Sequence, residues 1–120
     1  MAKILVVDDE PLTIDMLTAY LDLLGHESVG ALSGRQTWDI LAYQKPDLIL
    51  LDIMLPDTSG IDICREMRTK PEWADVPIVM ISAHSPPMIE EATQAGANDY
   101  LKKPINLNNL KDSLKRNGIG

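Results

Sequence analysis

The sequence has almost no cysteine and no long apolar run. Cys64 is the only cysteine among 120 residues, which excludes an internal disulfide and a zinc site built from several thiolates. Its place on the apolar stripe of an expected helix favours an inert core position over a reactive thiol. The longest apolar runs, such as Leu48 to Leu51 and Ile78 to Ile81, are too short to cross a bilayer, and no basic-then-apolar leader opens the sequence. We therefore expect a cytoplasmic protein with no membrane contact.

Positive charge is also scarce. Lys and Arg number 11 against 18 Asp and Glu, for a net charge of −7, which opposes direct binding to nucleic acid or to an anionic membrane. Cations and basic protein surfaces suit this chain better as partners. No repeat, low-complexity tract or linker interrupts the sequence. Since this length is enough to close one hydrophobic core, we expect residues 1–120 to form a single domain.

Five short, mostly apolar segments predict β-strands. They are Lys3–Val7, Glu27–Ala31, Leu48–Leu51, Pro77–Ile81 and Asp99–Lys102. The first, third and fourth have continuously apolar centres, which is typical of strands covered on both faces. After each strand, apolar residues recur at helical spacing, as in Leu17, Leu21 and Leu24. This strict alternation predicts an α/β fold with five helices around a doubly wound parallel sheet, and we expect the flavodoxin-like strand order 2-1-3-4-5.

Carboxylates follow two of these strands directly. Asp8 and Asp9 come after the first strand, and Asp52 comes after the third. In the expected order these strands are neighbours at the point where the sheet reverses, so the three side chains share one crevice. Close like charges cost stability unless a cation neutralises them, and a site of few carboxylates with water suits Mg²⁺. Stabilising a helix dipole explains one such aspartate but not three, so the pattern favours a Mg²⁺ site.

The same edge of the sheet carries residues suited to phosphoryl transfer. A carboxylate such as Asp52 can attack a phosphoryl group and form an acyl phosphate, provided that negative charge is screened. Lys103 comes directly after the fifth expected strand and can supply an ammonium group, and Ser82 comes directly after the fourth and can supply a hydroxyl. A backbone N–H near Ala83 could complete the site. Each residue alone is routine, but their joint placement indicates phosphoryl chemistry.

Four segments resemble the response-regulator receiver domains of two-component signalling, and the resemblance spans essentially the whole chain. They read ILVVDDEP (Ile4 to Pro11), PDLILLDIMLP (Pro46 to Pro56), IVMISA (Ile78 to Ala83) and AGANDYLKKP (Ala95 to Pro104), in the order and at the spacing of that family. The resemblance implies a fold like that of the chemotaxis regulators. It also implies a signalling protein that receives a phosphoryl group from a sensor histidine kinase or a histidine phosphotransfer protein, and not an enzyme acting on a separate substrate.

The resemblance also implies roles for single residues. Asp52 would be the phosphoacceptor, and Asp8 and Asp9 would hold Mg²⁺ directly or through water. Met54 would lend its backbone carbonyl to the metal. Lys103 would contact the phosphoryl group, and the bond between Lys103 and Pro104 is expected to be cis.

The remaining matches concern switching and phosphoryl lifetime. Ser82 matches the hydroxyl that follows the phosphoryl group, and Tyr100 matches the aromatic residue that turns inward on activation. The responding surface would be the fourth helix, fifth strand and fifth helix, which would serve as a homodimer interface or as the contact with an output domain or target protein. Met54 and His84 hold positions that tune phosphoryl loss, although His84 could equally be an ordinary loop residue. His26 lies before the second strand and is expected to be ordinary surface.

Three alternatives remain open from the sequence. An aspartyl-phosphate phosphatase usually has a second acid two residues after its nucleophile, where this chain has Met54. A flavin- or nucleotide-binding module of the same fold would need a glycine-rich first loop, and the loop from Asp8 to Pro11 has no glycine. A receiver-like interaction module that is never phosphorylated would not need this full set of acidic, hydroxyl and ammonium groups.

Overall fold

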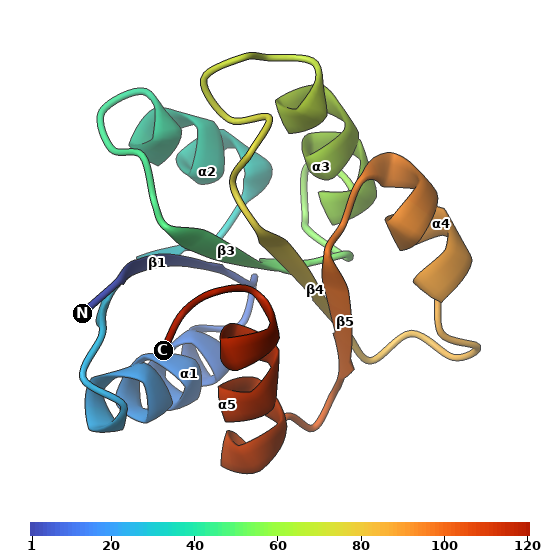
Figure 1. Cartoon of the computed structure of the whole chain (residues 1–120). Coiled ribbons are helices and arrows are strands. Elements are labelled where there is room, and N and C mark those ends of the chain that lie inside the picture. Colours follow the sequence, from blue (N-terminus) through green and yellow to red (C-terminus); the bar gives the residue numbers. More distant parts are fainter.

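The computed structural model describes all 120 residues. Five parallel strands alternate with five helices along the chain (Figure 1). The strands are β1 (Lys3–Val7), β2 (Glu27–Ala31), β3 (Leu48–Asp52), β4 (Ile78–Ser82) and β5 (Asp99–Lys102). The helices are α1 (Pro11–Leu23), α2 (Gly34–Leu41), α3 (Gly60–Arg68), α4 (Ile89–Ala95) and α5 (Leu107–Arg116). The sheet order is β2-β1-β3-β4-β5, which confirms the expected flavodoxin-like fold.

Two strands differ by one residue from the ranges expected from the sequence. β3 extends to Asp52, which pairs with Ile81, and β4 extends to Ser82, which pairs with Lys102. Pro77 lies just before β4 and offers only its carbonyl, which accepts from the backbone N–H of Ile49 at 2.9 Å. As a result, Asp52 and Ser82 are held by the sheet ladder itself and do not lie in the loops that follow.

Helices cover both faces of the sheet. Helices α1 and α5 lie on one face, and α2, α3 and α4 lie on the other (Figure 1). Because successive strand residues point to opposite faces, Val6 and Leu50 pack in the α1/α5 core, whereas Val7 and Leu51 pack in the core under α2 to α4. The central strands are therefore buried on both sides, as their continuous apolar runs predict.

The second core also contains the single cysteine. Cys64 is fully buried, its thiol lies 3.5 Å from the carbonyl oxygen of Ala95, and burial raises the pKa of the thiol. These surroundings match the inert core position that the sequence favours. No helix in the structure combines the length and the apolar character that crossing a bilayer requires.

Candidate functional site

Three carboxylates meet at the carboxyl edge of the sheet. Asp8 follows β1, where its backbone N–H donates to the carbonyl of Ala31 at 3.0 Å, and Asp52 is the last residue of β3. Asp8 and Asp52 are buried, and Asp9 is exposed. One oxygen from each of the three side chains lies within 4.8 Å of the other two. The topology thus brings Asp52 next to two acids that lie more than forty positions before it in the sequence.

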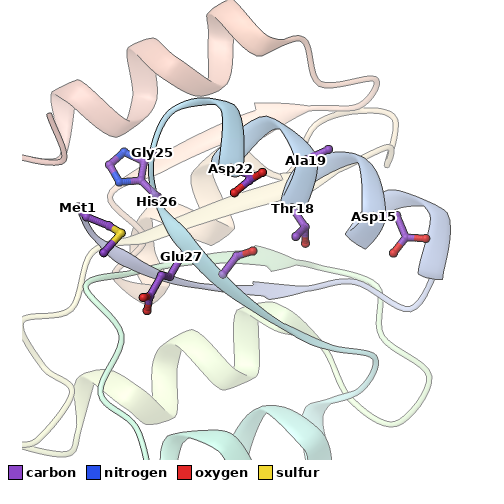
Figure 2. A pocket seen from close by; sticks show the side chains of 9 residues that line it. Met1, Asp15, Thr18, Ala19, Asp22, Gly25, His26 and Glu27 are labelled. Carbon is purple, nitrogen blue, oxygen red and sulfur yellow. The ribbon is translucent and has the colours of Figure 1, made fainter.

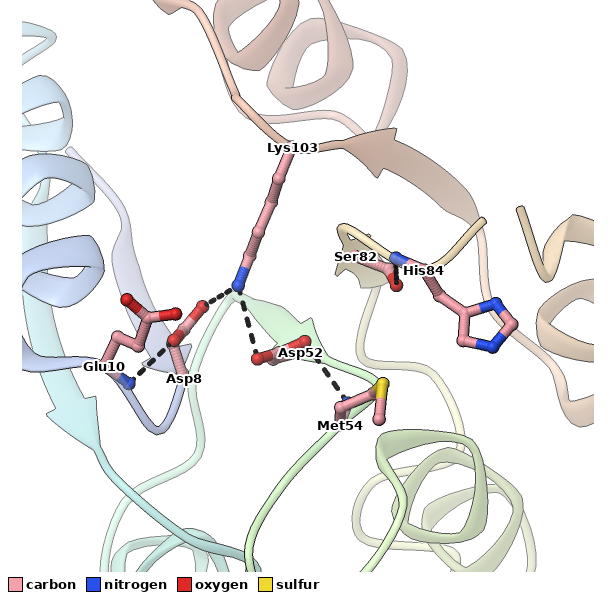
Figure 3. A network of polar contacts seen from close by, with 7 residues as sticks. All are labelled: Asp8, Glu10, Asp52, Met54, Ser82, His84 and Lys103. Carbon is pink, nitrogen blue, oxygen red and sulfur yellow. Dashed lines mark hydrogen bonds and ion pairs between the residues drawn. The ribbon is translucent and has the colours of Figure 1, made fainter. Parts of the chain in front are cut away.

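Lys103 joins the cluster from the end of β5. Its Nζ lies 2.6 Å from Oδ2 of Asp8 and 3.3 Å from Oδ2 of Asp52 (Figure 3). The remaining oxygens of the two acids accept backbone hydrogen bonds, Asp8 Oδ1 from Glu10 at 2.9 Å and Asp52 Oδ1 from Met54 at 3.2 Å. The peptide bond between Lys103 and Pro104 is cis. Every oxygen of the two buried acids therefore has a polar partner.

The charges in this cluster do not balance. Burial raises the pKa of Asp52 to about 6, Lys103 opposes the shift, and the Asp8 carboxylate adds to it. Burial opposes the charge on Lys103, but the hydrogen bond to Asp8 and the charges of both acids outweigh it, so the pKa of Lys103 lies above its usual value. One ammonium among three carboxylates leaves a net negative site.

The donors present fit a magnesium ion. All are oxygens, they are few, and Asp9 is open to solvent, which is the combination that Mg²⁺ prefers because it keeps part of its hydration shell. Asp8, Asp9 and Asp52 could hold the ion. The backbone carbonyl of Met54, two residues after Asp52 in the chain, is the additional oxygen that the family resemblance implies. A divalent cation would also offset the excess of negative charge.

Magnesium affinity should fall in mild acid. Since the pKa of Asp52 in the metal-free protein is about 6, a proton competes with the metal below that pH. We expect the dissociation constant for Mg²⁺ to rise about tenfold for each pH unit below the pKa and to level off above it. Calorimetric titration with MgCl₂ across this range measures the effect, and an affinity that does not change with pH would contradict a ligand role for Asp52.

Ser82 and Tyr100 lie on the side of the cluster toward α4. Ser82 is buried, and its Oγ accepts from the backbone N–H of His84 at 2.9 Å (Figure 3). Its hydroxyl proton is therefore free to be donated to another acceptor. Tyr100 is half-buried, and its hydroxyl accepts from the backbone N–H of Met88, just before α4, at 3.0 Å. A hollow of about 410 Å³ lined partly by Met54, His84 and Met88 lies beside these residues.

A more spacious hollow lies elsewhere and contains none of the candidate residues. It has a volume of about 710 Å³ between α1 and β2, and it is lined by acidic side chains such as Asp15, Asp22 and Glu27 (Figure 2). His26, also in its wall, corrects an expectation. It is only 8% exposed, and its Nδ1 accepts from the backbone N–H of Ala2 at 3.0 Å. The ring thus binds the backbone at the start of the chain, and His26 is a buried residue and not an ordinary surface residue.

Nothing in the sequence singles out Asp57, in the loop after β3, as a functional residue. Its carboxylate accepts from the backbone N–H groups of Gly34 at 2.8 Å and Arg35 at 2.9 Å, at the start of α2. These two bonds lower the pKa of Asp57. An aspartate in a loop is a common helix cap, but no local pattern says which distant helix it caps.

Comparison with known proteins agrees with this geometry. The family model described as "Response regulator receiver domain" matches residues 4–115. The chain belongs to the response regulator receiver domain family. Receiver domains of this family act in two-component signalling, and the family assignment implies a phosphoacceptor role for this chain.

Similar proteins include both regulators and isolated receiver structures. PhoB, the phosphate regulon transcriptional regulatory protein of Pseudomonas aeruginosa, is 37% identical over 122 residues, which cover 98% of this chain and 53% of PhoB. The receiver domain of the sensor histidine kinase PA1611 from Pseudomonas aeruginosa, solved with a magnesium ion coordinated in its active site cleft, is 34% identical with a TM-score of 0.87, and the match covers 96% of this chain and 95% of that one. TrrA from Thermotoga maritima, in complex with Mg²⁺-BeF, is 32% identical with a TM-score of 0.87, covering 98% and 99%. The chain spans about half the length of the curated relatives it matches.

Proposed function

We propose that this receiver domain accepts a phosphoryl group on Asp52 from the phosphohistidine of a sensor histidine kinase or a histidine phosphotransfer protein. The observation that carries the proposal is the Asp52 carboxylate at the end of β3, with the acids of the first loop within 4.8 Å and the Lys103 ammonium 3.3 Å away. Residues 1–120 would act together as one receiver unit. The two magnesium-containing relatives support the same site in this chain.

The chain's own residues account for the transfer. An oxygen of the Asp52 carboxylate attacks the phosphorus, and the new O–P bond forms as the P–N bond to the donor histidine breaks. The histidine nitrogen keeps the electron pair and takes up a proton. Magnesium bound by Asp8, Asp9, Asp52 and the Met54 carbonyl would supply screening of the negative charges. Lys103 lies 2.6 Å from Asp8, and we propose that it turns from that carboxylate to the phosphoryl oxygens.

We propose that phosphorylation changes the hydrogen bonds of Ser82 and Tyr100, on the side of the site that faces α4. Ser82 has a free hydroxyl proton and would donate it to a phosphoryl oxygen, which draws the end of β4 toward the site. Tyr100 would then turn inward and release the bond to the Met88 N–H that holds it at 3.0 Å. A phosphoryl group adds roughly −1.5 to −2 charges, enough to bias such a two-state element.

The responding surface and the partners belong to the same proposal. We propose that α4, β5 and α5 form the contact with an output domain, a target protein or a second copy of the chain. Exposed acids on α4, such as Glu90, and exposed bases on α5, such as Lys111, provide charges of opposite sign for a symmetric pair. We also propose a cytoplasmic location, and the proposed phosphoryl transfer needs neither nucleic acid nor a membrane.

The alternatives have less support. Position 54 holds a methionine that is 59% exposed, so the second acid of a phosphatase is absent from the place where it would be needed. The flavin- or nucleotide-binding alternative would need a glycine-rich first loop to hold a phosphate group, and the loop from Asp8 to Pro11 has no glycine. A module that is never phosphorylated would gain nothing from burying Asp8 and Asp52 beside Lys103, because unbalanced buried charge costs stability.

The direct test is phosphorylation by a small donor. We expect incubation with acetyl phosphate and Mg²⁺ to add one phosphoryl group, measured as intact mass, and the modification to be removed by hydroxylamine as an acyl phosphate should be. Chelation of the metal with EDTA should prevent the addition. An unmodified mass under conditions where binding of Mg²⁺ is demonstrated would contradict the proposal.

A further inference from the structure

The loop between β3 and α3 closes on itself. The backbone N–H of Gly60 donates to the carbonyl of Ile53 at 2.7 Å, the N–H of Leu55 donates to the carbonyl of Thr58 at 3.3 Å, and Met54 pairs with Ser59 as an isolated antiparallel bridge. This loop carries the backbone of Met54, which holds Asp52 Oδ1 through its N–H. The position of the loop therefore sets the position of groups in the site.

The base of the loop is packed tightly against the acceptor strand. Gly60 is buried, and a side chain there would overlap the carbonyl group of Asp52. This contact fixes Gly60 against Asp52, but it does not hold the residues between Ile53 and Gly60. The tip, residues 56–58, is exposed or half-buried and needs a different attachment.

Asp57 supplies that attachment. Its two carboxylate oxygens accept from the backbone N–H groups of Gly34 and Arg35, and no other side chain of the tip makes a hydrogen bond to the rest of the protein. Gly34 allows the close approach, because a side chain there would overlap the methyl group of Thr58. The loop tip is thus bound to the first turn of α2 by two bonds, each assisted by the negative charge of the carboxylate.

We infer that Asp57 is a positioning residue, which clamps the loop after β3 to the start of α2 and so holds the Met54 backbone in place for metal binding. The inference rests on the proposed function, since it concerns the same magnesium site. Residues that orient metal ligands commonly change affinity by tenfold or more when they are removed. Asp57 itself does not touch the cluster of Asp8, Asp9 and Asp52, so its effect would pass through the loop.

The test is the magnesium affinity of Asp57→Ala, Asp57→Asn and the wild type by calorimetry. We expect Asp57→Ala to raise the dissociation constant for Mg²⁺ about tenfold and Asp57→Asn, which keeps one acceptor oxygen, about threefold. Both variants lose the same charge, so a difference between them that persists in high salt assigns the effect to the hydrogen bonds. Equal losses that vanish in high salt would show only a distant charge effect and overturn the inference.

A matched control separates positioning from helix stability. Ser33→Ala removes the other cap of α2, the bond from the Gln36 N–H to Ser33 Oγ at 3.1 Å, and leaves Asp57 intact. We expect it to lower the melting temperature without changing Mg²⁺ affinity. Asp75→Ala, at an exposed acid paired with Lys45 before β4, controls for general charge removal. Weakening of Mg²⁺ binding by Ser33→Ala equal to that of Asp57→Ala would overturn the inference.

A measurement without metal distinguishes this inference from the function itself. In the metal-free protein, Asp57→Ala should speed amide hydrogen exchange at Leu55 and Gly60 several-fold, while exchange in β3 stays unchanged. If the wild type fails to bind Mg²⁺, the proposed function fails. If the wild type binds Mg²⁺ and both the affinity and the loop exchange are unchanged in Asp57→Ala, only the positioning role fails.

Discussion

Asp52→Asn is expected to abolish phosphorylation. The amide keeps the size of the carboxylate and can still accept from the Met54 N–H, but it lacks the negatively charged oxygen that attacks phosphorus. Asp8, the other buried acid that contacts Lys103, follows β1 and does not lie at the end of β3. Asp9 is exposed. Incubation with acetyl phosphate and Mg²⁺ should therefore leave the mass of this variant unchanged, whereas the wild type gains one phosphoryl group.

A suitable control is Asp15→Asn, which removes an exposed carboxylate on α1 that lies in the separate hollow between α1 and β2. It should be phosphorylated as fully as the wild type. A full equivalent of hydroxylamine-labile phosphate on Asp52→Asn would exclude Asp52 as the acceptor. In that case the other acids of the cluster would have to be tested in the same way.

The same substitution is expected to stabilise the metal-free protein at neutral and alkaline pH. Burial raises the pKa of Asp52 in the folded state from 3.8 to about 6. A group with a raised folded pKa contributes stability that is fully present below the unfolded pKa and is lost as the pH rises through the folded pKa. Asp52→Asn removes this loss, so its advantage in unfolding free energy over the wild type should grow by about 2 kcal/mol from about pH 4 to about pH 8.

Urea denaturation of both proteins in EDTA measures that difference directly. Other acids act in the opposite direction: burial raises the pKa of Asp99, but its bonds to Ser113 and Arg116 outweigh this and leave the pKa lowered, so its contribution is lost as the pH falls. The contributions of such acids to the unfolding free energy cancel when the two proteins are compared at the same pH. Addition of Mg²⁺ should stabilise the wild type more than the variant, and a constant difference across the pH range would contradict the raised pKa.

Much of the fold could be predicted because local pattern and packing agree. Continuous apolar runs such as Leu48 to Leu51 indicated strands buried on both faces, and β3 and β4 lie in that environment. β3 and β4 each end one residue later than the sequence predicts. Whether Asp52 and Ser82 belong to a strand or to the following loop depends on pairing with Ile81 and Lys102, which lie in other segments of the chain.

The candidate site residues could be predicted from the sequence because parallel strands place their carboxyl ends at one edge of the sheet. Asp8, Asp52, Ser82 and Lys103 each follow or end a strand, so the expected strand order alone put them in one crevice. The burial of His26 could not be predicted, since nothing in its sequence neighbourhood indicates that its ring nitrogen would accept a hydrogen bond from the backbone N–H of Ala2. Contacts of this kind join segments whose separation in the sequence carries no pattern.

Short segments of sequence are enough to predict the alternation of strands and helices, the acidic pair after β1, the acceptor candidate after the apolar run of β3, and the family. These are properties of short segments, set by side-chain periodicity and residue type. Three other features follow from the packing of the folded chain: Lys103 contacts Asp8 at 2.6 Å, the pKa of Asp52 is raised to about 6, and Asp57 binds the start of α2. Distances, burial and electrostatic coupling depend on how distant segments pack together, and a linear pattern does not contain that information.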